Sequence, residues 1–467
     1  MTSKNSSVNT KDVQGIFKGF GLKWPYGRFF YCNYSTADAG RELLNRLAPL
    51  TSFHDVSEAK SKICINAAFT FHGLKALDVD TEILSSLPPE FVAGMQSRAD
   101  INGDAGESAP SCWEDIWKKH RVHIWVGVYA ETEGLLQEWQ RQFEGWVSSQ
   151  EEGVTIIGSQ DVSRLVSRKD QPVYIEDPAS QPQTPVLLEH FGFRDGMGNP
   201  AIKGLVDKHV AGSGSLGVDG KWSALPTGEF LLGYVDSNGE IPIAPKPQSF
   251  SQNGTFMVLR KLAQDVDLFR DYLSELAGRL DGNADDIASR MVGRRRDGTP
   301  LIKDAKSDFD FTFQSDSEGR QCPMGSHMRR ANPRDSFGEG FGSLLVDRHR
   351  ILRRAITYGK LVEHGQRQAE VNGDDGQGLM FIVLNASISR QFEFVQQQWI
   401  NYGNEFNQGN DRDPIVGLQE GGGQMVIPGD KQRKSVICDN LRQFVTCRGG
   451  DYFFLPGIDA FCGLAKG

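Results

Sequence analysis

Residues 254–280, GTFMVLRKLAQDVDLFRDYLSELAGRL, join two patterns that decide the fold class. The first nine residues are rich in apolar, β-branched and aromatic side chains, which is typical of a strand. From residue 263 to residue 280 apolar side chains recur at helical spacing, so a helix is expected there. The same order of strand and helix occurs at residues 28–34 and 36–47. We therefore expect a strand–helix unit in each half of the chain.

Further elements complete the repeat. In the first half, residues 131–147 carry apolar side chains three or four positions apart and predict a helix. Additional strands are expected in that half at 62–71, 121–130 and 154–158. In the second half, strands at 378–387 and 451–455 accompany a helix at 390–402. Two β-α-β…β-α-β halves predict an α+β protein with two ferredoxin-like domains, antiparallel sheets and peripheral helices.

Turn-forming sequences separate the two halves. Residues 177–185 are rich in Pro and Gln, and residues 212–228 are rich in Gly. We therefore expect an N-terminal domain over residues 1–215, which ends with the loop GFRDG, and a C-terminal domain over residues 216–467.

Composition excludes several classes of protein. The chain of 467 residues is 39% hydrophobic, which excludes disorder over most of its length. Its net charge of -9 argues against a general nucleic-acid binder. The longest apolar run, Leu379–Leu384, is far shorter than the roughly 20 residues that span a membrane. The polar N-terminus has no signal-peptide pattern, so we expect a cytoplasmic protein, with secretion left open for a processed form.

The seven cysteines exclude some metal and redox sites, because none of them forms a CxxC or CxxCH motif. A zinc ribbon, a thioredoxin-type pair and covalently attached c-type haem are therefore not expected.

Three polar segments interrupt surroundings rich in Phe and Gly. Residues 192–200, GFRDGMGNP, hold Asp195 between glycines, although an ordinary Asp-Gly turn would look the same.

Residues 322–334 contain His327 followed by Arg329, Arg330 and Arg334, which offers one imidazole ligand beside cations that bind carboxylates. An anionic macrocycle such as haem, with two propionates, needs that pairing, and a solvated basic loop is the alternative. Residues 348–359 are also basic, and a surface helix is the alternative there.

Together these segments resemble the dye-decolorizing peroxidase family. The run GFRDG is similar to that family's GxxDG signature. Ser326-His327 with Asn332-Pro333-Arg334 resembles its proximal-ligand motif, and residues 351–354 with Tyr358-Gly359 resemble its distal-arginine motif. Further similar stretches lie at 254–261, 394–399 and 413–417, and the length of the chain is typical of the larger members.

The resemblance implies a haem peroxidase of the dimeric α+β barrel-like kind. Haem b, bound non-covalently and mainly by the second domain, would reduce hydrogen peroxide and oxidise bulky dyes and phenolic or other aromatic donors in one-electron steps. His327 would be the iron ligand, with Asp413 as its hydrogen-bond partner. Asp195 and Arg353 would act on the distal side, where Ala355 replaces an Asn of some members. A homodimer is also possible.

The same resemblance assigns further residues to the cofactor pocket and to electron transfer. Arg329 and Arg334 would bind the cofactor's carboxylates, and apolar walls would come from Phe193, Phe381 and Leu384. Because bulky dyes do not fit a buried pocket, family members commonly pass electrons through surface aromatic residues. Tyr358 and Trp399 are the candidates here, although either could instead be a core residue.

Three other functions remain open from the sequence. One is a haem-binding or haem-handling protein without significant turnover, against which the pair of Asp195 and Arg353 argues because storage requires neither. Another is a non-haem interaction module built from ferredoxin-like domains. The third is a related haem fold that splits chlorite, against which the GxxDG signature counts.

Overall fold

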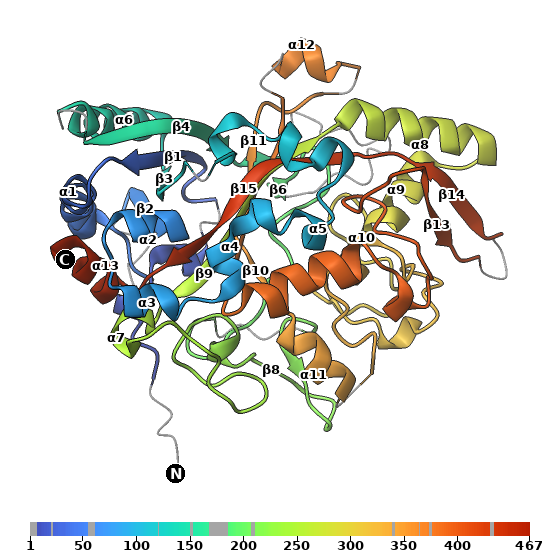
Figure 1. Ribbon diagram of the computed structural model, residues 1–467. Helices are drawn as coiled ribbons and strands as arrows, with labels where there is room; N and C mark the ends of the chain where they lie inside the picture. Colours follow the sequence, from blue (N-terminus) through green and yellow to red (C-terminus); the bar gives the residue numbers. More distant parts are fainter. Residues whose placement is uncertain are drawn as a thin grey trace.

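The protein is seen here in a computed structural model, which describes residues 7–19, 22–54, 61–119, 121–149, 153–167, 185–206, 211–338, 341–363, 365–372, 376–429 and 434–467. Its centre is a sheet of nine strands with antiparallel ladders (Figure 1). Helices cover the outside of this sheet, which confirms the predicted α+β class. Among the helices of the described chain, none has the length and apolar character needed to cross a membrane.

The first half of the chain forms a ferredoxin-like unit. Its strands lie side by side in the order β4-β1-β3-β2. Their bounds are β1 (Tyr26–Tyr34), β2 (Ile63–Phe69), β3 (Ile124–Ala130) and β4 (Val154–Ser163). Helices α1 (Ala37–Leu47) and α6 (Glu133–Ser148) follow β1 and β3 and pack against the strands. Each helix begins after a threonine, Thr36 or Thr132, whose hydroxyl accepts a hydrogen bond from a backbone N–H of the first turn.

The second half repeats the arrangement with longer connections. Its strands lie in the order β11-β12-β9-β15. Their bounds are β9 (Thr255–Gln264), β11 (Ile356–Tyr358), β12 (Gly378–Asn385) and β15 (Val445–Leu455), and the short β10 (Leu352–Arg353) also pairs with β12. Helix α8 (Val266–Leu280) follows β9. The predicted helix over 390–402 is replaced by two π-helical segments, Ile388–Glu393 and Val395–Ile400.

The two halves join at both edges, so that the eight strands other than β10 close into a ring. Strand β4 meets β11 through the pair Ser163 and Thr357, and β2 meets β15 through the pair Phe69 and Phe454. One hydrophobic core draws buried residues from both halves. The predicted boundary between residues 215 and 216 falls inside β7 (Ser215–Leu216), which pairs with β8 (Trp222–Ser223). Division into domains 1–215 and 216–467 stays a prediction, and residues 177–184 of the predicted linker lie outside the described residues.

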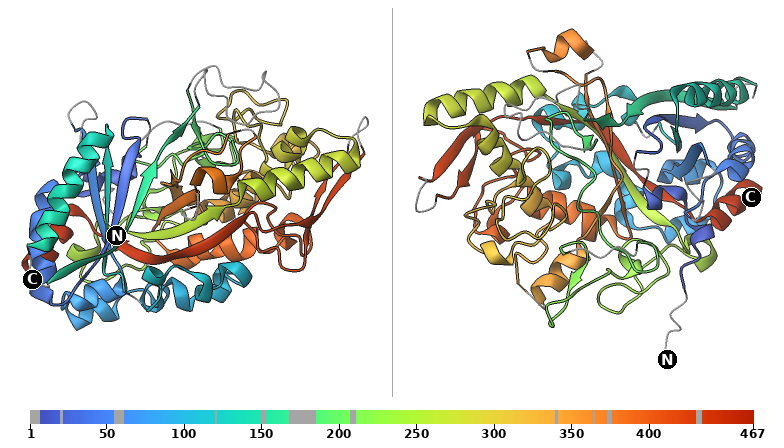
Figure 2. Two further views of the ribbon diagram at one scale, coloured as in Figure 1. Left: turned by 90° about the horizontal axis from the view of Figure 1, so that it is seen from above. Right: turned by 180° about the vertical axis from the view of Figure 1, so that it is seen from behind.

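A second layer lies beside the part of the sheet formed by the second half (Figure 2). Its core joins α8 and α9 (Ala284–Val292) to the hairpin of β13 (Gly423–Ile427) and β14 (Val436–Leu441). Short elements complete the fold: α2 (Phe71–Ala76), α3 (Thr81–Ser85), α4 (Pro89–Ser97), α5 (Ala99–Asn102), β5 (Leu165–Val166), β6 (Leu187–Leu188), α7 (Gln248–Ser251), α10 (His327–Ala331), α11 (Phe341–Arg348), α12 (Gln368–Asn372) and α13 (Ile458–Lys466).

Candidate active site

A cavity lies between the sheet of the second half and the second layer. Side chains of β9, β12 and β15 form one wall, and residues of α9, α10 and the segment after Asp413 border the cavity as well. Successive side chains of a strand point to opposite faces. Leu379 and Phe381 of β12 therefore face the cavity, while Met380 and Ile382 lie in the core of the ring.

His327 opens α10 and borders the cavity. Its Nδ1 lies 2.9 Å from Oδ2 of Asp413, whose side chain is fully buried. The other oxygen of Asp413 accepts hydrogen bonds from the backbone N–H groups of Ile415 and Val416, both at 2.9 Å. Burial alone would raise the pKa of Asp413, but the His327 ring and the backbone donors hold it below its usual value. This carboxylate therefore fixes the His327 ring and leaves Nε2 as the nitrogen for a ligand.

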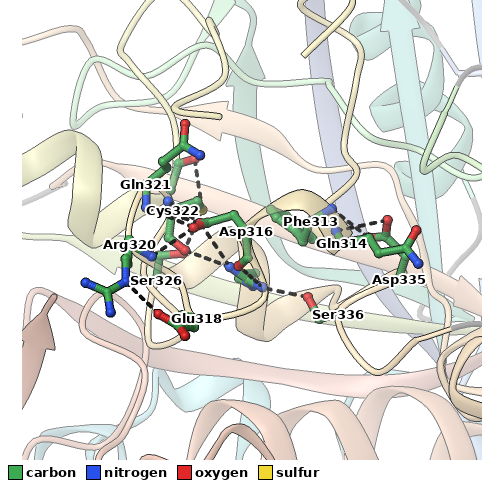
Figure 3. A network of polar contacts seen from close by, with 12 residues as sticks. Phe313, Gln314, Asp316, Glu318, Arg320, Gln321, Cys322, Ser326, Asp335 and Ser336 are labelled. Atoms are coloured by element: carbon green, nitrogen blue, oxygen red, sulfur yellow. Dashed lines mark hydrogen bonds and ion pairs between the residues drawn. The ribbon is translucent and has the colours of Figure 1, made fainter. Parts of the chain in front are cut away.

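The loop before α10 is held by Asp316 (Figure 3). Its carboxylate accepts hydrogen bonds from the backbone N–H groups of Arg320 and Cys322, at 2.9 and 2.8 Å. Arg329 completes this network, because its guanidinium donates to the backbone carbonyls of Asp316 and Cys322 at 2.9 and 2.8 Å. The network fixes the start of α10 and therefore the position of His327.

The segment GFRDGMGNP forms a tight loop at the cavity. Gly198 has φ of 72°, a conformation that favours glycine, and a Cβ there would lie 2.6 Å from Nη2 of Arg334, so a side chain would displace that guanidinium. Glu189 fastens the loop, since its carboxylate accepts hydrogen bonds from the N–H groups of Phe191 and Phe193 at 2.9 and 2.8 Å. Burial raises the pKa of Glu189. The loop presents Asp195 to the cavity.

Asp195 and Arg353 form an ion pair at the edge of the cavity. Nη1 of Arg353, on β10, lies 3.6 Å from Oδ1 of Asp195, and Nη2 donates to the carbonyl of Met197 at 3.1 Å. The side chains are 15% exposed for Asp195 and 34% for Arg353, so both reach the cavity. A carboxylate and a permanent cation are thus held together where a small polar molecule can reach them.

A group of buried arginines borders the same cavity. Arg334 donates to the carbonyls of Gly212 and Asn332 at 3.1 and 3.0 Å, and within the described chain it makes no ion pair. Burial, together with the neighbouring cations Arg350, Arg294 and Arg353, lowers its pKa well below the usual value. A buried cation without a carboxylate partner is costly, so this edge of the cavity is suited to an anionic ligand.

Comparisons with known proteins agree with this geometry. The family model for the C-terminal part of Dyp-type peroxidases matches residues 243–411. The dye-decolorizing peroxidase of Exidia glandulosa is 28% identical, with 98% of this chain and 87% of the relative covered. Dye-decolorizing peroxidase AauDyP1 of Auricularia auricula-judae is 27% identical over the same shares of the two chains. The chain is similar to dye-decolorizing peroxidases over nearly its whole length, and its residues 243–411 match their family model. The crystal structure of AauDyP complexed with imidazole has the same fold, with a TM-score of 0.78, 24% identity and coverage of 98% of this chain and 100% of that one.

Dye-decolorizing peroxidases are haem enzymes, and the cavity fits that cofactor. His327 would hold the haem iron through Nε2, which is the usual role of a histidine hydrogen-bonded through its other nitrogen. Arg334 supplies the buried, unpaired cation that a propionate would match. Leu379 and Phe381 supply the apolar wall.

Two residues expected at the cofactor lie elsewhere in the structure. Arg329 does not border the cavity, because Asp316 and Cys322 engage its guanidinium in the loop before α10. Leu384 lies in the core of the ring, since it is three positions from Phe381 and therefore points to the opposite face of β12. Leu379, two positions from Phe381, takes the place expected for Leu384.

The expected surface aromatics are both buried. Tyr358 is 2% exposed, and burial raises its pKa. Trp399 is fully buried and donates from Nε1 to Glu405 at 2.5 Å. Its ring meets that of His349 edge to face, with centroids 5.5 Å apart, and His349 borders the cavity. Both side chains therefore pack in the interior of the protein and are not surface sites.

Several residues at the cavity were missed from the sequence. Glu189 lies three positions before Gly192 of the GFRDG loop, and this closeness was the available signal for its hydrogen bonds to the N–H groups of Phe191 and Phe193. Arg350, in the basic segment, donates to the carbonyls of Gly212, Ser213 and Gly214, a contact over more than 130 positions that no local pattern predicts.

Proposed function

We propose that this enzyme binds haem b in the cavity, where Nε2 of His327 would hold the iron and Arg334 would pair with a propionate, and that Asp195 and Arg353 act on hydrogen peroxide. The observation that carries the proposal is that one cavity brings together the His327–Asp413 pair and the Asp195–Arg353 pair. Bound there, haem supplies the redox-active iron for the reaction of peroxide with one-electron donors.

Asp195 moves the proton in this scheme. Its Oδ1 faces Arg353, which leaves Oδ2 to accept a proton from one oxygen of hydrogen peroxide and to return it to the oxygen that leaves as water. Arg353 stays charged throughout and stabilises the negative charge that develops on the departing oxygen. Asp413 accepts the Nδ1 proton of His327, which sets the tautomer and makes the ring a stronger donor at Nε2.

Dyes and phenols are the proposed electron donors. The relatives are dye-decolorizing peroxidases, and one solved structure of this fold is a dye-decolorizing peroxidase in complex with 2,6-dimethoxyphenol. For donors too large for the cavity, Tyr358 and Trp399 are proposed as internal electron carriers rather than as surface sites. The contact of Trp399 with His349 gives a route to the cavity wall.

The test is an absorption spectrum of the purified protein before and after one equivalent of hydrogen peroxide. A haem band that changes within seconds in the wild type, and at least about 100-fold more slowly in Asp195→Asn, is expected from the loss of the proton acceptor. A haem band that does not respond to peroxide would favour haem handling without turnover. A protein without a haem band, after haem is supplied during expression, would contradict the cofactor.

A further inference from the structure

A second charged pair lies in the wall of the same cavity. Arg260, on β9, forms an ion pair through Nη2 with Oδ1 of Asp104, which follows α5. The side chains are 5% exposed for Arg260 and 2% for Asp104, and both border the cavity. Strand β12 separates β9 from β10, the strand of Arg353. Two strand spacings of about 4.8 Å and a stagger of two residues along β12 place the backbones of Arg260 and Arg353 roughly 12 Å apart.

Each partner of this pair keeps one polar atom free. Nη1 of Arg260 and Oδ2 of Asp104 are buried and have no hydrogen-bond partner within the described ranges of the chain. Burial raises the pKa of Asp104 more than the charge of Arg260 lowers it. Because unmet buried donors and acceptors are costly, a ligand or water is expected to satisfy both atoms.

The free atoms define the chemistry of that ligand. One donor and one acceptor side by side match a hydroxyl group, which accepts from Nη1 of Arg260 and donates to Oδ2 of Asp104. A carboxylate ligand would be repelled by Asp104, and an ammonium group would be repelled by Arg260. Phe392 lies next to the pair, with its ring centroid 5.8 Å from the guanidinium carbon of Arg260. Phe381 is the cross-strand partner of Arg260 and shares its face of the sheet.

We propose that Arg260 and Asp104 bind the hydroxyl group of a phenol, with its ring against Phe392 and Phe381, at a site separate from Asp195 and Arg353. This inference rests on the proposed function in taking phenols as donors. It adds a place in the molecule where the donor is held before it is oxidised.

The test measures binding without turnover. Phenol and benzoate are titrated separately into the resting holoenzyme by calorimetry, with no peroxide present. In Asp104→Asn the amide oxygen keeps the bond from Nη2 of Arg260, so the amide NH2 replaces the free acceptor. Two donors then face the ligand, and we expect phenol to bind at least about tenfold more weakly and benzoate more tightly than in the wild type.

A second variant guards against loss of folding, since Asp104→Asn leaves the charge of Arg260 unpaired. Arg260→Lys keeps the ion pair, but its single ammonium nitrogen cannot occupy the positions of both Nη1 and Nη2, so phenol binding should weaken about tenfold. Arg98→Lys is the matched control, because Arg98 pairs with buried Glu393 through two bonds of 2.8 and 2.6 Å and does not border the cavity. Its phenol affinity should equal that of the wild type.

The outcomes separate this inference from the proposed function. If the wild type has haem and turns over peroxide but does not bind phenol, the pair holds only water and the inference is wrong. Equal phenol affinity in the wild type, Asp104→Asn and Arg260→Lys would also overturn it, because phenol would then bind elsewhere. Failure of the proposed function itself would appear in the wild type as the absence of haem or of a reaction with peroxide.

Discussion

Replacing Asp413 by Asn changes one atom and should switch the tautomer of His327. The Asn oxygen can keep the two backbone hydrogen bonds from Ile415 and Val416, because both reach the same carboxylate oxygen, Oδ1. The NH2 group then faces Nδ1 of His327, which must give up its proton to accept a hydrogen bond. The proton moves to Nε2, the nitrogen proposed to bind iron.

The magnitude follows from this loss of a single orienting contact. Changes of this kind lower metal affinity about 10–100-fold, or about 1.4–2.7 kcal/mol. The free energy of unfolding of the haem-free protein should change less, since the backbone bonds of residue 413 are retained. Haem affinity is measured by transfer to an excess of a haem-scavenging protein, and unfolding by urea titration of the haem-free chain.

Asp411→Asn is the matched control for this prediction. Asp411 lies two positions earlier, and its side chain accepts from Gln424 at 3.1 Å rather than from His327. We expect its rate of haem transfer to equal that of the wild type. If Asp413→Asn also loses haem at the wild-type rate, Asp413 does not set the tautomer of His327, and the reasoning fails.

Three further predictions use the same structure. Arg353→Leu should retain haem and react with peroxide about 100-fold more slowly in stopped-flow experiments, since a charge donor at a developing anion is worth about 3 kcal/mol. An unchanged rate would contradict the role of Arg353. Buried Arg354 could not replace it, because its guanidinium donates to the carbonyls of Ile16 and Phe17. Trp399→Phe should slow oxidation of a bulky dye more than oxidation of a small phenol, and equal effects on both donors would remove Trp399 from the electron route. Burial raises the pKa of Asp347 from 3.8 to about 6, so its contribution to stability is present below pH 4 and is lost as the pH rises through 6. Between pH 4 and pH 7.5 the wild type should therefore lose about 3 kcal/mol more than Asp347→Asn in urea unfolding, and parallel pH profiles of the two proteins would refute this.

Local patterns predicted the elements that carry strong periodicity. The strand–helix unit at 254–280 exists as predicted, but β9 runs on to Gln264 and Asp265 caps α8, so the helix begins at Val266. Residues 263–265, predicted as the first residues of the helix, thus belong to the end of β9 and to the N-cap of α8. Boundaries of this kind depend on pairing with a neighbouring strand, here Val445 opposite Gln264, which no local window contains.

The site was predictable where the motifs are contiguous. Asp195, His327, Arg334 and Arg353 all border the cavity. Leu384 could have been placed correctly from strand alternation alone, because positions 381 and 384 differ in parity. The position of Arg329 depends on Asp316, thirteen positions earlier, whose loop structure has no periodic signal.

Long-range pairs were beyond the sequence altogether. Asp104 and Arg260 are 156 positions apart, and no local pattern links them. The packing of α4 against β15, the neighbour of β9, helps bring the segment of Asp104 to this part of the sheet.

That closure also constrains how the chain is made. The ring is sealed by one pair of residues at each junction, and the strand that seals the second junction, β15, begins only at Val445. During synthesis β2 and β9 therefore emerge from the ribosome long before their shared neighbour exists, with backbone donors and acceptors unsatisfied along both edges. Until β15 is made, these two strand edges stay open and can pair with another chain. Yield in a heterologous host should consequently depend on chaperones that cover strand edges, and removal of β15 should produce aggregates rather than a smaller folded enzyme.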